Sequence, residues 1–224
     1  NGAAYAVTVF TQPTTPNQTC AVTTGSGTIS GANVTNVAVA CTTNTYTIGG
    51  SVSGLAAGNS VVLRNNGGND LTVAANGAFT FSTALADEST YAVTVFTQPT
   101  TPNQTCVVSN GSGTLAGANV TNVSVTCTTN SYTVGGTITG LPAGDSVTLR
   151  NNGGNDLIVS ANGAFTFTTP IVDAGSYVVT VQTQPTTPNR ICLVSSGSGS
   201  VAGANVSSVV VDCVTDAMFN NGFE

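Results

Sequence analysis

The sequence repeats itself with a step of 86 residues. Tyr5, Tyr91 and Tyr177 begin three copies of one stretch, and residues 5–20 and 91–106 are identical. Self-similarity at a fixed period indicates a tandem array of one structural unit. We therefore divide the chain into an incomplete unit at 1–45, complete units at 46–131 and 132–214, and a tail at 215–224 that has no counterpart in the repeat.

Short runs of alternating apolar and polar residues fill each unit. In the clearest run, 90–97, the side chains of Tyr91, Val93 and Val95 share one face of a predicted strand. Gly-, Asn- and Pro-rich turn signals follow at the 8–12-residue spacing typical of a sandwich, and no stretch shows a helical period. The sequence predicts an all-β fold of tandem Ig-like β-sandwich modules with about seven strands each.

Each repeat carries two cysteines, 21 positions apart. An even number of cysteines at fixed spacing favours disulfides and an oxidising compartment. A metal site is the alternative, but the chain has no histidine and no C-x-x-C pair. Closing a loop of this length is worth about 3 kcal/mol in the loop-entropy model. The predicted bridges, one per module, are Cys20–Cys41, Cys106–Cys127 and Cys192–Cys213.

The charge composition excludes several kinds of partner. Charged residues make up 5% of the chain, lysine is absent, and the net charge is −6. Binding to nucleic acid or to anionic lipid needs clustered cations, so neither partner is expected. No apolar run approaches the length of a membrane span. The first residues already lie inside a repeat, so we expect a mature secreted product or the ordered part of a longer one.

Catalytic chemistry is poorly represented. The chain has no His, Lys or Trp, and Asp87-Glu88 is its one adjacent carboxylate pair. One repeat later the same positions hold Asp173-Ala174, and one repeat earlier Asn1-Gly2, so we interpret the pair as solvated loop residues. A serine or threonine nucleophile needs a base beside it. The sequence predicts that the protein is not an enzyme and needs no metal or cofactor.

An Asn-Asn-Gly-Gly-Asn loop occurs in both complete units, flanked by Arg64 and Asp70 in one and by Arg150 and Asp156 in the other. The loop either binds calcium or a small ligand through its oxygens, or ends a hairpin closed by an ion pair. The ion pair is favoured, because each loop offers a single carboxylate.

Proline-flanked threonines and several Asn-x-Ser/Thr triplets raise the question of attached sugar. We interpret the triplets, which include Asn33 and Asn119, as turn-forming asparagines beside strand threonines. Ser/Thr/Pro stretches can carry O-linked sugar. The candidate positions are Thr14, Thr15, Thr100, Thr101, Thr186 and Thr187.

The incomplete unit at 1–45 holds only the last three of the predicted strands and leaves apolar positions uncovered. Either upstream residues or another subunit must complete it, the latter by strand addition, with the tail 215–224 as a candidate donor. The edges of the complete units, poor in lysine and charge, are either meant for pairing or covered by the QPTTPNQ segments. The predicted assembly residues are Tyr5, Val7, Val9, Val37, Val39, Met218, Phe219 and Phe223.

Four motifs recur in order in each complete unit: G-x-V-x-G-L (with Ile138 in place of the valine in the second unit), V-x-L, N-G-x-F-x-F and Y-x-V-x-V, at 48–55, 61–63, 76–81 and 91–95 in the first. This pattern resembles the carboxypeptidase-regulatory-like and collagen-adhesin B-type repeats. The resemblance implies a β-sandwich used as a stalk module on bacterial surface proteins. The Lys–Asn isopeptide crosslink of the adhesin relatives is impossible here without lysine. The repeat and the F-x-x-G-F-E ending are also similar to secreted proteobacterial proteins.

Together these features predict an extracellular structural protein. The leading hypothesis is a subunit of a bacterial surface filament or pilus-like fibre, assembled head to tail from identical subunits by β-strand complementation. The alternative is a rigid stalk in a large secreted adhesin that binds surface glycans.

Overall fold

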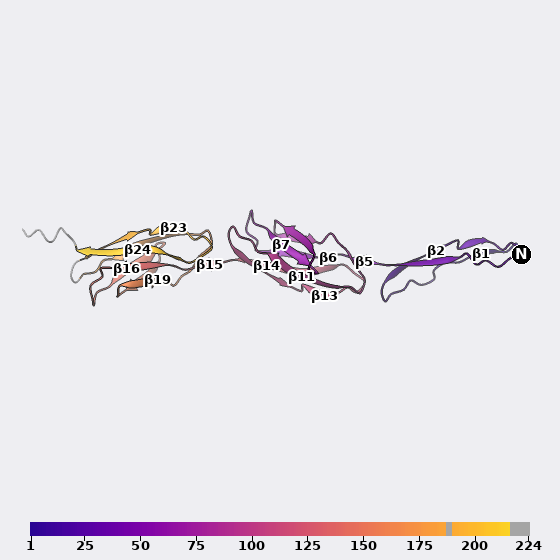
Figure 1. The fold of residues 1–224 in the computed structure, drawn as a ribbon, viewed down its shortest axis with the longest axis horizontal. Helices are drawn as coiled ribbons and strands as arrows, with labels where there is room; N and C mark the ends of the chain where they lie inside the picture. Colours follow the sequence, from indigo (N-terminus) through magenta and orange to yellow (C-terminus); the bar gives the residue numbers. More distant parts are fainter. Residues whose placement is uncertain (187–189, 216–224) are drawn as a thin grey trace, which may run out of the picture. The chain divides into compact units, whose positions relative to one another are not determined.

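The computed structural model describes residues 1–186 and 190–215, and all the regular structure in these ranges is β-strand (Figure 1). The chain forms two compact units. The first unit consists of residues 1–98 and 106–127. The second consists of residues 99–105 together with the residues from 128 onward. The predicted all-β fold of tandem Ig-like sandwich modules, one disulfide in each and the first incomplete, is confirmed.

The first complete sandwich consists of two four-stranded sheets. One has the order β13-β11-β7-β8 and the other β12-β14-β6-β9, and a two-residue pair, β5 with β10, lies beside them. The strands are β5 (Thr45–Tyr46), β6 (Ile48–Ser53), β7 (Val61–Asn65), β8 (Asn69–Val73), β9 (Gly77–Thr80), β10 (Leu85–Ala86), β11 (Thr90–Thr97), β12 (Gln104–Ser109), β13 (Ser112–Thr114) and β14 (Val120–Thr129).

The core of this sandwich is built from the inward positions of both sheets. Tyr91 and Val93 are buried while their neighbours on β11 are exposed, as the alternation predicts. Leu63 of β7 and Val125 of β14 are completely buried. The rings of Phe79 and Phe81 meet edge to face with centroids 5.9 Å apart.

The second complete sandwich repeats the same topology. Its sheets have the orders β19-β16-β24-β22 and β18-β17-β21-β23, with β15 paired to β20. The strands are β15 (Ser131–Tyr132), β16 (Val134–Thr139), β17 (Val147–Asn151), β18 (Asn155–Val159), β19 (Gly163–Thr166), β20 (Ile171–Val172), β21 (Ser176–Thr183), β22 (Arg190–Ser195), β23 (Ser198–Ser200) and β24 (Val206–Thr215).

Each sandwich therefore has eight strands in its two main sheets, one more than the approximately seven that the sequence predicts. The additional strand, β13, lies in a Gly-Ser-Gly segment that reads as a turn. Gly113 pairs with Tyr91 of β11, and the tyrosine ring lies so close that it would crowd a Cβ on Gly113. The glycine is in this strand because the ring occupies the space of a side chain.

The first and last long strands of each sandwich run parallel. β6 pairs with β14 from Val120 to Thr126, and β16 pairs with β24 in the same way. The two backbones approach so closely that a Cβ added to Gly50 would overlap the carbonyl oxygen of Val123. Gly136 stands in the same relation to Val209.

All six cysteines are paired as the spacing predicts. Cys20 lies directly opposite Cys41 in the ladder of an antiparallel pair, and Cys192 lies opposite Cys213. Each bridge therefore ties the last strand of its unit to the strand beside it.

Residues 1–45 fold as two separate two-stranded sheets, β1 with β3 and β2 with β4. They contain four strands, where the sequence predicted three: β1 (Ala4–Ala6), β2 (Gln18–Thr23), β3 (Ser26–Thr28) and β4 (Ala38–Thr43). β1 has three residues where its counterpart β11 has eight, and β4 has six where β14 has ten. The sequences are nearly the same, so the difference arises from the partner strands that residues 1–45 lack.

Candidate assembly surfaces

A buried aspartate joins the incomplete unit to the first complete sandwich. Asn17 donates its backbone N–H to Oδ2 of Asp87 at 2.7 Å, and Gly117 donates its backbone N–H to Oδ1 at 2.8 Å. The side chain of Asp87 thus connects a loop of one repeat with a loop of the next. Backbone bonds from Asn44 to Asn17 and from Asp87 to Asn44 complete the junction.

The same junction occurs in the second compact unit. Asp173 accepts the backbone N–H of Asn103 at 2.6 Å and that of Gly203 at 2.6 Å. Asn130 donates its backbone N–H to Asn103 and accepts that of Asp173. We call these two sites the aspartate junctions.

The aspartate junctions leave no linker. Asn44 alone separates β4 from β5, and Asn130 alone separates β14 from β15. Both asparagines use their backbone N–H and C=O groups in the junction itself. The residues that connect successive repeats are therefore all hydrogen-bonded.

Hydrogen bonds to the charged form determine the titration of these aspartates. The backbone N–H of Asn17, and then that of Gly117, lowers the pKa of Asp87, although burial acts in the opposite direction. The backbone N–H of Asn103, and then that of Gly203, lowers the pKa of Asp173 in the same way. Both carboxylates are therefore ionised at neutral pH.

The interpretation of Asp87 as a solvated loop residue was wrong. Asp87 and Asp173 are each 7% exposed, and only Glu88 of the adjacent pair is exposed. The sequence feature that could have identified this role was the recurrence of aspartate at a step of 86, in a chain where charged residues are rare. The comparison with Asn1 concealed it, because the copy at the start of the chain has no carboxylate at this position.

The Asn-Asn-Gly-Gly-Asn loops close hairpins. Arg64 pairs with Asp70 through two hydrogen bonds, Nε to Oδ1 at 2.5 Å and Nη2 to Oδ2 at 2.8 Å. Arg150 and Asp156 repeat this pair, so the ion pair that the sequence favoured is confirmed. In each pair the guanidinium lowers the pKa of the carboxyl group.

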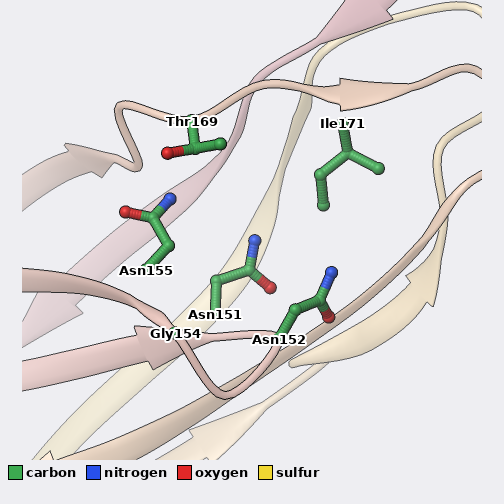
Figure 2. Close-up of a pocket in the computed structure, with 6 residues that line it drawn as sticks. All are labelled: Asn151, Asn152, Gly154, Asn155, Thr169 and Ile171. Atoms are coloured by element: carbon green, nitrogen blue, oxygen red, sulfur yellow. The ribbon is translucent and has the colours of Figure 1, made fainter.

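In the second of these loops two of the asparagine oxygens are already engaged. Figure 2 shows Asn151, Asn152 and Asn155 around a small pocket, with Thr169 and Ile171 on its other side. Oδ1 of Asn151 and Oδ1 of Asn152 both accept the backbone N–H of Val178. Among the described residues no group of three or more acidic, His or Cys side chains could hold a metal ion. The loop therefore anchors its hairpin to the neighbouring strand.

The outermost strand on one side of each sandwich is covered by a glutamine. Gln98 accepts the backbone N–H of Cys106 through Oε1 at 2.8 Å and donates Nε2–H to the Cys106 carbonyl at 3.1 Å. The amide thus takes the place of a neighbouring strand on β12. Gln12 and Gln184 do the same at Cys20 and Cys192. Of the two interpretations of the edges, covering by the QPTTPNQ segment holds at this edge.

The candidate glycosylation sites are accessible where the structure describes them. Thr14, Thr15, Thr100, Thr101 and Thr186 are exposed, and Thr187 lies outside the described residues. Modification of these hydroxyls stays a prediction. The triplet asparagine Asn119 has a structural role, because its Oδ1 accepts the backbone N–H of Thr47 at the start of the sandwich.

The predicted assembly residues of the incomplete unit lie on an uncovered face. Val7 is 44% exposed and Val39 is 56% exposed, while Tyr5, Val9 and Val37 are half-buried. The predicted donor residues Met218, Phe219 and Phe223 lie outside the described residues. Sequence reasoning missed Phe10, which is fully exposed and lies beside this face in the chain.

Comparison with known proteins finds no matching family model and no matching curated protein. Among solved structures, the chain is similar to the TIE protein of Bacillus anthracis, with 13% identity over 80% of this chain and 37% of that one, at a TM-score of 0.44. It is also similar to the pilus adhesin SpaC of Lactobacillus rhamnosus GG (14% identity, 80% and 32% coverage, TM-score 0.27) and to the major pilin T-13 of Streptococcus pyogenes (12% identity, 78% and 98% coverage, TM-score 0.23). The chain thus spans about a third of the first two proteins.

Proposed function

We propose that the protein is an extracellular structural spacer, a tandem array of sandwich modules that carries tension along a surface stalk or fibre. The observation that carries this proposal is the parallel pairing of the first and last long strands in each complete module, β6 with β14 and β16 with β24. Tension enters a module through its first strand and leaves through its last. Because these strands run parallel, pulling on the two ends slides one strand along the other, and all the ladder hydrogen bonds resist together.

The disulfides support both the location and the mechanical role. Structural disulfides persist in oxidising, extracellular environments. The bridge Cys106–Cys127 also connects the last strand to its neighbour, so the 21-residue loop between the cysteines cannot extend under tension. The increase in length when the module unfolds is therefore smaller.

The aspartate junctions support an array whose modules act in series. Asp87 and Asp173 bind backbone N–H groups on both sides of each junction, and no unbonded linker residue intervenes. A catalytic role is not proposed, since Asp87, the buried member of the adjacent carboxylate pair, accepts backbone N–H groups in one of these junctions. In the described part of the chain no helix is long and apolar enough to cross a membrane.

Single-molecule force spectroscopy on the full chain, held at its two ends, tests this proposal. We expect two unfolding events of similar force, one for each complete module. Reducing the disulfides should lengthen each event by about 70 Å, the extended length of the released loop. Gradual extension without distinct force peaks would exclude the load-bearing role.

The uncovered face of residues 1–45 favours a second form of the same function, in which subunits assemble head to tail by strand complementation. Electron microscopy of the purified chain separates the two forms, because complementation predicts long uniform fibres and a stalk predicts single particles. Deleting residues 215–224 tests the tail as the donor. Fibres that form unchanged after the deletion would exclude it.

A further inference from the structure

The two complete modules contain five asparagines that are followed directly by glycine. At such a step the backbone nitrogen of the glycine can attack Cγ of the asparagine and close a succinimide ring. Glycine has no side chain to hinder the approach. Both reacting groups belong to one chain, so the reaction needs no partner molecule. The asparagines are Asn66, Asn76, Asn110, Asn152 and Asn162.

Two of these side chains are held through both amide atoms. Asn76 accepts the backbone N–H of Leu55 through Oδ1 and donates Nδ2–H to the Leu55 carbonyl, both at 2.8 Å. Asn162 makes the same two bonds with Leu141. Ring closure at either asparagine requires both bonds to break first, so the fold protects these two amides.

The loop that carries Asn66 is attached to β11. Asn66 donates Nδ2–H to the carbonyl of Thr90 at 2.9 Å and its backbone N–H to that of Ala92 at 3.0 Å. Two residues earlier, the guanidinium of Arg64 lies over the ring of Phe96, 3.3 Å from its centroid. These contacts attach both the loop and β7 to the same strand, so the amide of Asn66 is restrained.

The corresponding loop of the second module is held in the same way. Asn152 donates Nδ2–H to the carbonyl of Ser176 at 2.9 Å, and its Oδ1 accepts the backbone N–H of Val178 at 2.8 Å. Both amide atoms of Asn152 are therefore engaged, as they are in Asn162.

Asn110 is held less firmly than the other four. It is exposed, has a φ of 54°, and lies where the chain crosses from the sheet of β12 to the sheet of β13. Within the described residues its amide makes a single hydrogen bond, from Nδ2 to the carbonyl of Asn122 at 3.3 Å. The backbone N–H of Gly111, which supplies the attacking nitrogen, donates to no group in the part of the chain that the structure describes.

The same turn in the other two repeats has no amide side chain. The counterparts of Asn110 are Thr24 and Ser196, with φ of 52° and 51°. Thr24 donates its hydroxyl to the carbonyl of Asn36, the counterpart of Asn122. A hydroxyl side chain therefore suffices for this turn, and only module 46–131 has a reactive amide there.

We propose that Asn110 is a site of spontaneous deamidation, which modifies the first complete module with age and has no counterpart at Ser196 in the second. The backbone nitrogen of Gly111 loses its proton and forms a bond to Cγ of Asn110. The bond from Cγ to Nδ2 breaks, and Nδ2 leaves as ammonia. Water then opens the succinimide: cleavage of the new bond to Cγ gives aspartate, and cleavage of the original peptide bond gives isoaspartate. The net change is uptake of water and loss of ammonia.

Either product alters the crossing between the two sheets. A carboxylate cannot donate to the carbonyl of Asn122, so the bond from the turn to β14 is lost. Isoaspartate also adds a backbone carbon between β12 and β13. Gly113 of β13 pairs with Tyr91 under a ring that leaves no space for a side chain. We therefore expect β13 to separate from β11, while the parallel pair of β6 and β14 remains.

Incubation of the full chain at neutral pH, followed by peptide mapping with mass spectrometry, tests the assignment. We expect the mass gain of an NH2-to-OH exchange to accumulate first at Asn110, as aspartate and isoaspartate. Asn76 and Asn162 should convert more slowly, by about two- to ten-fold for each additional hydrogen bond that must break. Equal conversion at all the Asn-Gly steps, or aspartate without isoaspartate at Asn110, would overturn the proposal.

The same incubation of the reduced chain in denaturant separates the effect of the fold from that of the local sequence. Glycine follows each of these asparagines, so their rates should become similar once the hydrogen bonds are lost. A preference for Asn110 that persists in the unfolded chain would show that the neighbouring residues select the site, and would overturn the structural argument.

Two variants test the consequence for β13. Asn110→Ser introduces the residue of the second module's turn, and it should keep the fold and abolish the mass gain at this position. Asn110→Asp imitates one product, and it should accelerate amide exchange at residues 112–114 relative to Asn110→Ser, with no change at 198–200. Unchanged exchange at 112–114 in both Asn110→Asp and the aged chain would contradict the effect on β13. The unfolding force of each module should stay the same, so the load-bearing role is tested independently.

Discussion

Asn17 and Asp87 are 70 residues apart in the sequence and are joined by a hydrogen bond of 2.7 Å from the backbone N–H of Asn17 to Oδ2 of Asp87. The bond links one repeat to the next, and Asn103 and Asp173 form the same bond one repeat later. In a chain with few charges, two of its nine carboxylates thus hold the positions where repeats meet.

Replacing Asp87 with asparagine should loosen its junction without unfolding the sandwich. One carboxylate oxygen becomes an NH2 group, which faces backbone N–H donors and cannot accept from them. We expect faster amide exchange at Asn17 or Gly117, measured by NMR. Glu88→Gln is the matched control, because it removes the neighbouring exposed carboxylate. Unchanged exchange in Asp87→Asn would show that the junction does not depend on the charge.

Acid should weaken both junctions. Because the folded-state pKa of Asp87 and Asp173 is lowered, their contribution to stability is present above the unfolded pKa of about 3.9 and is lost as the pH falls through the folded value. Amide exchange at Asn17 and Asn103, measured relative to the intrinsic rate of an unprotected amide at the same pH, should therefore accelerate below about pH 4. An Asp87→Asn/Asp173→Asn variant should lose most of this acceleration, whereas Asp70→Asn/Asp156→Asn should keep it. Equal acid sensitivity in both variants would contradict the assignment.

Removing one disulfide should destabilise the module that contains it. Replacing Cys106 and Cys127 together by alanine releases the constraint on a 21-residue loop, which is worth about 3 kcal/mol. Denaturant unfolding followed by hydrogen exchange in β6 and β14 measures the loss. Cys20→Ala with Cys41→Ala is the control, since that bridge lies in the incomplete unit and should leave β6 and β14 unaffected. A similar loss of stability at β6 and β14 in the control would contradict the expectation that each disulfide stabilises only its own module.

Gly50 should tolerate no side chain. A Cβ at this position overlaps the carbonyl oxygen of Val123 in the parallel ladder, so Gly50→Ala should separate β6 from β14 and cost more than about 4 kcal/mol. The expected result is loss of NMR signals from module 46–131. Gly68→Ala is the control, because nothing lies near a Cβ there, and its effect should stay within about 1 kcal/mol. A folded Gly50→Ala module would show that the close approach is not required.

Local patterns were sufficient for much of the fold. The alternation at 90–97 places Tyr91 and Val93 inward, and the 21-residue spacing pairs Cys106 with Cys127, because side-chain direction and loop closure depend on residues near one another. The same reasoning missed β13, whose glycine is explained only by the ring of Tyr91 on the neighbouring strand. It also misread Asp87, whose partners lie 70 and 30 residues away.

The repeat period, the all-β class, the cysteine pairs and the incompleteness of residues 1–45 are properties of the sequence by itself, since each follows from spacing along the chain. The tertiary structure decided which strands run parallel, which carboxylates join the repeats and which ring an arginine covers. These features depend on which distant backbone segments come together. In residues 1–45 nearly the same sequence forms shorter strands because the partner strands are missing. Local sequence does not specify the partner that determines how far a strand extends.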